Sequence, residues 1–197
     1  MLDVGCGYGL FLDEIKKTKK CDVSGIEISE HAYLYSKNEL SLNVLNCELT
    51  SSIFKSESFD VVFLLGTIEH LEKPKEILSI IYGLLKPEGL LVITTLNTKS
   101  LIPFYAIKPP EHLFYFNSNN LILLLKNTGY KIIYKKVLFV YYYIHTLVHI
   151  FIRFLSLSKM DFVIKLLEKL PKISIKFITN EMCIVASKEN NQDCIIL

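Results

Sequence analysis

Short apolar runs alternate with amphipathic stretches along most of this 197-residue chain. The runs have the length of buried strands, and the stretches between them place apolar residues at helical spacing. The predicted strands cover residues 1–4, 23–28, 43–47, 59–65, 90–96, 131–138 and 182–187. Helices are predicted over residues 10–18, 30–41 and 74–85, and between an N-cap at Ser118 and Gly129. This alternation predicts an α/β fold, a parallel sheet with helices on both faces.

Length, charge and cysteine content narrow the class of protein. The length suits one domain with a sizeable core, so we expect a single domain over residues 1–197. A formal net charge of +2 gives no basis for binding nucleic acid by bulk electrostatics. Five cysteines without a C-x-x-C pair suit a reducing compartment, and we expect no disulfide scaffold and no metal site. The first residues lack the pattern of a secretory signal, so we expect a cytoplasmic protein.

A glycine-rich loop follows the first predicted strand. Gly5, Gly7 and Gly9 stand at alternate positions and lead directly into a predicted helix, whose N-terminus offers unpaired N–H groups to a ligand. The dinucleotide fingerprint G-x-G-x-x-G would require a glycine where Leu10 stands. The loop therefore favours a ligand without a pyrophosphate, and Asp3 can meet a cationic group of that ligand.

Glu27 ends the second predicted strand. A carboxylate at the carboxyl end of a second parallel strand can accept both hydroxyls of a ribose. The structural alternative is an acid at the start of the helix that follows Ser29. We favour the ribose role because the glycine loop and the acid occur together at a suitable spacing.

Five segments carry a family resemblance. In chain order they read LDVGCGYG, VSGIEIS, SFDVVFLLGTIEHLEKP, LLKPEGLLVITTLN and HLFYFNSNNLILLLKNTGYKII. The chain resembles the class I S-adenosylmethionine-dependent methyltransferases, and among them the small-molecule subgroup that includes quinone O-methyltransferase-like enzymes. The resemblance covers residue 1 to about residue 134 and resumes at residues 180–188.

The resemblance implies a Rossmann-like, doubly wound, seven-stranded sheet that is mostly parallel, with an antiparallel last strand. It also implies a helix before the first strand. This N-terminal helix is missing here, because Met1 falls inside the predicted strand. A fragment or a shortened start is therefore an expectation that stays open. Between the sixth and last strands we expect a hydrophobic helical insertion at about 139–178.

The resemblance further implies S-adenosylmethionine as the cofactor. The glycine loop would carry its methionine part and Glu27 its ribose. The family usually has an aspartate after the third strand, where this chain has Cys47 and Glu48, so either Glu48 substitutes or the backbone alone serves. The implied cofactor-binding residues are Asp3, Gly5, Cys6, Gly7, Tyr8, Gly9, Glu27, Ile28, Cys47, Glu48 and Gly66.

Two histidines are candidate general bases for a hydroxyl acceptor. His70 follows the fourth strand, and His112 lies in the segment after the fifth strand, where the family usually builds its acceptor site. Histidine titrates in the range that a general base needs. The structural alternatives are a residue that packs the next helix, for His70, and a loop-anchoring hydrogen bond, for His112. We expect His112, slightly ahead of His70, to face the cleft.

Residues 137–157 form an apolar run with one charged residue, Arg153, and are long enough to cross a bilayer. A membrane span is disfavoured because it would separate the last strand from its sheet. The run then caps the acceptor site, covers a dimer surface, or lies on a membrane with Tyr141 to Tyr143 at the interface. The last interpretation predicts peripheral contact with the inner face of the membrane.

These observations predict an S-adenosylmethionine-dependent methyltransferase that acts on a small-molecule, lipid-linked or sugar-linked acceptor, most simply by O-methylation. Two alternatives stay open. One is a non-catalytic methyltransferase-like subunit or fragment. The other, disfavoured by Leu10, is a nicotinamide-dependent oxidoreductase.

Overall fold

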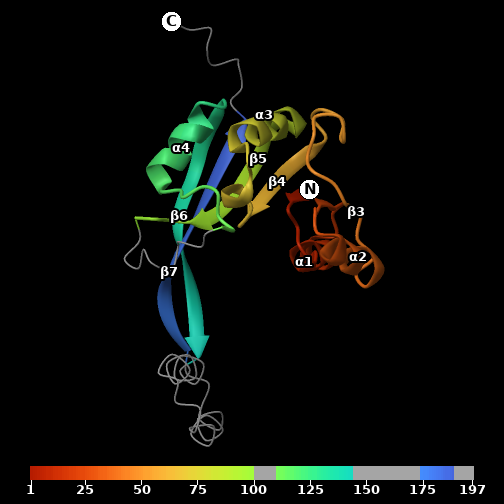
Figure 1. The fold of residues 1–197 in the computed structure, drawn as a ribbon, viewed down its shortest axis with the longest axis horizontal. Coiled ribbons are helices and arrows are strands. Elements are labelled where there is room, and N and C mark those ends of the chain that lie inside the picture. Colours follow the sequence, from red (N-terminus) through yellow and green to blue (C-terminus); the bar gives the residue numbers. More distant parts are fainter. Residues whose placement is uncertain (100–109, 144–173, 189–197) are drawn as a thin grey trace, which may run out of the picture. The chain divides into compact units, whose positions relative to one another are not determined.

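The computed structural model describes residues 1–99, 110–143 and 174–188. Seven strands form one sheet in the order β3-β2-β1-β4-β5-β7-β6 (Figure 1). The strands are β1 (Leu2–Val4), β2 (Ser24–Ile26), β3 (Val44–Leu45), β4 (Phe59–Leu65), β5 (Leu85–Leu96), β6 (Tyr130–Tyr143) and β7 (Ser174–Lys188). The helices are α1 (Leu10–Lys19), α2 (Glu30–Asn38), η1 (Ile68–His70), α3 (Pro74–Leu84) and α4 (Ser118–Lys126).

The topology confirms the predicted Rossmann-like sheet. β1 pairs in parallel with β2 and with β4, β2 pairs in parallel with β3, and β4 does so with β5. β7 is antiparallel to β5. The strand order reverses at β1, so the carboxyl ends of β1 and β4 flank the switch point where ligands of such sheets bind.

Helices cover both faces of the sheet. On one face the fully buried row Leu64–Ile93–Ile184 packs with residues of α3 and α4 in a single core cluster. The Tyr130 hydroxyl at the start of β6 donates to the carbonyl of Leu78 in α3 (2.9 Å). The opposite face carries α1, whose Phe11 ring meets Phe63 of β4 with 4.9 Å between centroids.

Element boundaries differ from the prediction mainly near the insertion. β4 covers residues 59–65 as predicted. β6 and β7 are longer than predicted, because they also include residues 139–143 and 174–181, and of these 139–143 and 174–178 fall in the predicted insertion. The predicted helical insertion is therefore strand at both of its ends, and the rest of it lies outside the described residues. By contacts, Val137–Thr179 form a compact unit distinct from the unit of Met1–Lys136 and Asn180–Leu197.

The N-cap of α4 is Asn117, one residue before the predicted Ser118. Its side-chain oxygen accepts the backbone N–H groups of Asn119 (3.0 Å) and Asn120 (3.2 Å). The Asn120 side chain in turn accepts the N–H of Asn117 (2.8 Å). This reciprocal pair is a capping box, which fixes the start of the helix more firmly than a serine alone.

None of the helices in the described part of the chain combines the length and apolar character that crossing a bilayer requires.

Candidate functional site

The glycine loop forms the turn from β1 into α1. Gly5, Gly7 and Gly9 have φ angles of +77°, +54° and +76°, which L-residues with a Cβ rarely adopt. The N–H groups of Gly5 and Cys6 both donate to the Ile26 carbonyl of β2 (2.8 and 3.0 Å). The loop is thereby tied to the carboxyl end of β2 and ends at Gly9, the N-cap of α1.

Gly5 and Gly7 of this loop face different surroundings. A Cβ at Gly5 would lie 2.7 Å from the side chain of Thr67, so the loop packs directly against the segment after β4. A Cβ at Gly7 would meet no atom within 4 Å. Gly7 is therefore the point where the loop backbone is open to a ligand.

Glu27 follows β2 and reaches the same loop. One carboxylate oxygen accepts the N–H of Gly7 (2.7 Å), and the other accepts the N–H of Ser29 (2.7 Å). A carboxylate has about four acceptor positions, so two remain for hydroxyl donors. The predicted ribose contact stays a prediction, and the contact with the loop is an additional role that the sequence did not reveal.

Asp3 lies beneath the loop at the end of β1. It is 3% exposed, and its Oδ1 accepts no hydrogen bond from the described residues. Burial, together with the nearby Glu27 carboxylate, raises the pKa of Asp3 to about 7. A buried acceptor without a donor is costly, so Asp3 is suited to receive a donor, and above all a cationic one, from a ligand.

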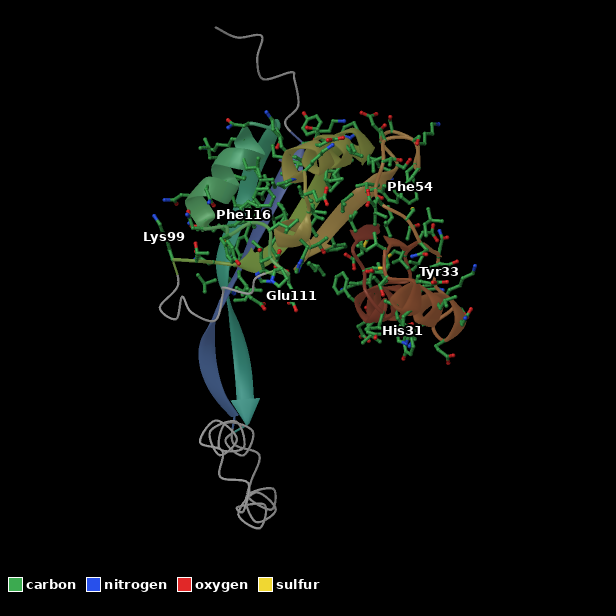
Figure 2. The ribbon with its side chains drawn as sticks, viewed as in Figure 1. His31, Tyr33, Phe54, Lys99, Glu111 and Phe116 are labelled. Carbon is green, nitrogen blue, oxygen red and sulfur yellow. The ribbon has the colours of Figure 1, made fainter. Side chains whose placement is uncertain are left out.

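The side chains of Cys6 and Tyr8 leave the loop in different directions. The Cys6 sulfur points to the protein interior, only 2.7 Å from a Cβ built on Gly25, and burial raises the pKa of its thiol to about 12. Tyr8 is exposed and meets Tyr35 and His31 edge-on, with ring centroids 5.3 and 5.8 Å apart. Figure 2 shows His31 on the side of α1 and α2. The backbone groups of Cys6 are engaged within the loop, because its N–H donates to Ile26 and its carbonyl accepts the N–H of Gly9 (3.0 Å), whereas Tyr8 can offer a ligand its ring.

The strand ends next to Glu27 hold the other predicted cofactor residues. Ile28 is 72% exposed and offers an apolar surface. Cys47 packs against the core, whereas Glu48 is exposed. The sequence did not single out Asn46, whose side-chain amide donates to the carbonyls of Glu27 (2.8 Å) and Ile28 (3.1 Å). Asn46 therefore fixes the end of β2 beside the end of β3.

Gly66 follows β4 and is exposed, with φ +64°. Its N–H donates to the Thr94 carbonyl of β5 (2.9 Å). The chain then turns into η1 next to Thr67, the residue that contacts Gly5. The segment that carries His70 consequently starts beside the glycine loop.

His70 and His112 come together although they lie in separate segments. Their ring centroids are 4.8 Å apart at an interplanar angle of 80°. His70 is exposed, whereas His112 is 8% exposed. Nδ1 of His70 lies 2.7 Å from the carbonyl oxygen of Glu111, which can only accept, so Nδ1 carries the proton and Nε2 is free to accept one. Figure 2 shows Glu111 near the arrowhead of β4.

Glu69 joins this pair, and the sequence did not reveal it. It is 5% exposed, and its carboxylate accepts the hydroxyl of Thr95 (2.9 Å). Glu69, His70 and His112 each offer an atom that could ligate a metal, and these atoms lie within 4.8 Å of one another. The sequence predicted no metal cluster because these residues come from two distant segments.

The backbone of Glu69 also seats the segment after β5. Its carbonyl accepts the N–H groups of Leu113 (2.9 Å) and Phe114 (3.1 Å). Leu113, Phe114 and Tyr115 are 51%, 38% and 39% exposed. An exposed apolar and aromatic segment therefore adjoins the two histidines.

Comparison with known proteins identifies similar domains. Residues 1–135 match the model of a family described as a methyltransferase domain. The mitochondrial ubiquinone biosynthesis O-methyltransferase of Dictyostelium discoideum is 30% identical over 129 residues, 58% of this chain and 40% of that protein. The ubiquinone biosynthesis O-methyltransferase of Coxiella burnetii (strain Dugway 5J108-111) is 29% identical over 119 residues, 58% of this chain and 50% of that protein. The chain thus spans about half the length of these curated relatives.

Solved structures share the fold. A SAM-dependent methyltransferase from Archaeoglobus fulgidus has a TM-score of 0.63 and 25% identity, over 95% of this chain and 85% of that one. A 1,6-didemethyltoxoflavin-N1-methyltransferase from Burkholderia thailandensis, solved with S-adenosylhomocysteine, has a TM-score of 0.59 and 15% identity, over 96% and 70%. At that identity the second likeness concerns the fold alone.

Proposed function

Because this chain belongs to the S-adenosylmethionine-dependent methyltransferase family, we propose that it transfers a methyl group from S-adenosylmethionine to an oxygen of a small-molecule acceptor. The observation that carries this proposal is the pairing of an open Gly7 with a buried oxygen of Asp3 that has no hydrogen-bond partner among the described residues. A ligand with a cationic donor could lie against the backbone at Gly7 and donate a hydrogen bond to Asp3.

The residues present fit this cofactor. Asp3 would receive the ammonium of its methionine part, and the backbone around Gly7 would lie against it. The two acceptor positions left on Glu27 would take the ribose hydroxyls. Ile28 would cover one face of the adenine and the Cys47–Glu48 segment would border it, whereas Gly66, at the end of β4 on the other side of β1, would border the methionine part. When bound, the cofactor supplies a methyl group on a positively charged sulfur.

We assign proton removal from the acceptor to His70. Its Nε2 is free to accept a proton, because the Glu111 carbonyl holds the ring proton on Nδ1. The exposure of His70 favours it over the buried His112, whereas the sequence analysis slightly preferred His112. His112 packs against the ring of His70 and orients it.

Glu69 completes this assignment. Proton transfer from a neutral hydroxyl to His70 would create an imidazolium on that ring. Positive charge would therefore develop at the histidine pair. The buried carboxylate of Glu69 lies within 4.8 Å of the ligand-capable atoms of both rings, where it stabilises that charge.

We further propose a hydroxylated aromatic acceptor with an apolar, lipid-like tail. The curated relatives are named for ubiquinone biosynthesis, and Leu113, Phe114 and Tyr115 offer an apolar and aromatic surface beside the histidines. The protein would act in the cytoplasm, with residues 137–157 in peripheral contact with the inner face of the membrane. Most of those residues lie outside the described ranges.

Calorimetry with S-adenosylhomocysteine, and separately with NADH, tests the cofactor. We expect binding of the first ligand alone. Binding of NADH alone would support an oxidoreductase instead.

Formation of S-adenosylhomocysteine in the presence of a catechol with an alkyl tail tests the transfer. We expect His70→Ala to lower turnover by about 10²–10⁴-fold while leaving the affinity for S-adenosylhomocysteine unchanged. A Lys126→Ala variant, which alters an exposed residue of α4, is the control and should keep its turnover. Full activity of the His70→Ala/His112→Ala variant would contradict the assignment, and loss of activity on adding a chelator would assign the cluster to a metal instead. Cofactor binding without turnover on any hydroxylated acceptor would favour the non-catalytic alternative.

A further inference from the structure

The sheet has one face that helices cover only in part. Along β4, β5 and β7 the paired residues Phe63, Val92 and Val185 are half-buried, whereas the alternating row on the other face is fully buried. Successive residues of a strand point to opposite faces. Tyr130 of β6 points to the helix-covered face, because it reaches Leu78 in α3. The alternate residues of β6 therefore belong to the partly covered face.

These alternate residues of β6 are Lys131, Ile133 and Lys135, which we call the lysine face. All three are exposed, and Ile133 is 55% exposed. β6 is the last strand of the sheet, so the lysine face forms its border. Neither lysine takes part in an ion pair with a described residue.

We propose that the lysine face binds an anionic lipid surface. Lysine ammonium groups attract anionic headgroups, and the aliphatic residue between them adds apolar contact at the boundary of the acyl chains. This inference deepens the membrane contact of the proposed function and rests on it, but it places a second contact on residues of the sheet itself.

Three observations favour lipid over a protein partner. The first observation is charge. Basic groups and an aliphatic group alternate on the lysine face, whereas the neighbouring row of Phe63, Val92 and Val185 carries no charge. The second observation concerns Glu181 of β7, an acidic residue that is already engaged in an interaction of its own. Chain continuity is the third, since the last residues of β6 are also the first residues of the apolar run 137–157.

Co-sedimentation with vesicles tests this proposal. The full chain is mixed with phosphatidylcholine vesicles that contain or lack phosphatidylserine, at low salt. We expect binding only to the vesicles with phosphatidylserine. Lys131→Glu/Lys135→Glu should reduce this binding at least about twenty-fivefold, because each lysine near such a surface contributes about fivefold.

The control variant is Lys75→Glu/Lys126→Glu. It changes the net charge equally, but its exposed lysines lie on α3 and α4, which pack on the opposite face. Its vesicle binding should stay within about twofold of the wild-type value. Affinity for S-adenosylhomocysteine, measured by calorimetry on every variant, shows that each is folded and reports separately on the proposed cofactor site.

Equal loss of vesicle binding in both double variants would overturn the proposal, because it would indicate net charge alone. Loss only on deleting residues 141–157 would also overturn it, while leaving the peripheral contact of that run intact. A wild-type chain that stays unbound and elutes as a dimer, with the dimer lost in Lys131→Glu/Lys135→Glu, would assign the lysine face to contact between copies.

Discussion

Gly7 combines a left-handed backbone conformation (φ +54°) with open space where a Cβ would stand. We expect Gly7→Val to abolish binding of S-adenosylhomocysteine, because its side chain would occupy the surface on which the ligand lies. The strained backbone should also lower the free energy of unfolding by about 1–2 kcal/mol. Calorimetry and thermal unfolding measure the two effects.

Gly83 in α3 is the matched control for that variant. A Cβ there also meets no atom within 4 Å, but Gly83 lies on a helix and outside the loop. Gly83→Ala should keep the affinity unchanged and raise helix stability by about 1 kcal/mol. Equal affinities in the wild type, Gly7→Val and Gly83→Ala would place the cofactor elsewhere.

The raised pKa of Asp3 predicts an unusual dependence of the free energy of unfolding on pH. Its pKa is raised by burial and by Glu27 from an ordinary value of 3.8 to about 7 in the folded protein. Between these two values the folded state holds a proton that the unfolded state has lost. The contribution of Asp3 to stability is therefore present below about pH 4, falls as the pH rises toward 7, and is lost above it.

We expect Asp3→Asn to be more stable than the wild type at about pH 8, by at most about 4 kcal/mol, and the difference to shrink at about pH 5. Denaturant unfolding at the two pH values measures it. Glu27→Gln should produce part of the same change, since the Glu27 carboxylate raises the pKa of Asp3. A stability difference independent of pH would contradict this account of Asp3.

At the scale of elements, the capping box of α4 predicts a measurable contribution to stability. Asn117→Ala removes the acceptor of two N–H groups in the first turn and should lower the free energy of unfolding by about 1 kcal/mol. Asn119→Ala is the matched control, because no described hydrogen bond involves its side chain; its change should stay within about 0.5 kcal/mol. Equal effects of the two variants would show that the cap does not stabilise the helix.

The sequence predicted most elements because hydrophobic periodicity is a local property. β4 is an apolar run interrupted only by Asp60, and it lies where it was predicted. The start of α4 was one residue off, because asparagine and serine both cap helices and the returning bond from Asn120 is not visible in a pattern. The start of the insertion became strand, because an apolar run rich in tyrosine and valine fits a helix and a strand equally well.

The candidate site was predictable where its residues lie in one segment. The glycine loop and Glu27 have a fixed spacing, so their proximity could be expected. Glu69 could not be found from the sequence. It precedes His70 and a lysine-rich turn, so it resembles a solvated surface residue. Only the fold brings Thr95 and His112 to it.

At the scale of the whole molecule, the division into two units predicts that the cofactor site is independent of the insertion. Replacing residues 141–176 by a short Asn-Gly turn should leave the affinity for S-adenosylhomocysteine within about threefold of the wild-type value, since Asp3, Gly7 and Glu27 all belong to the other unit. Calorimetry measures it, with thermal unfolding to show that the shortened chain is folded. Complete loss of affinity in a folded variant would show that the insertion takes part in cofactor binding.

The inward-pointing thiol of Cys6 has a consequence for how long each molecule could remain active. A sulfonium methyl group is an alkylating agent, and a thiolate is among the strongest nucleophiles of a protein. The glycine loop would thus hold its own competitor for the methyl group. Because burial raises the pKa of the Cys6 thiol to about 12, the sulfur stays protonated at neutral pH and unreactive. The loop would thereby resist alkylation by a methyl donor bound on it.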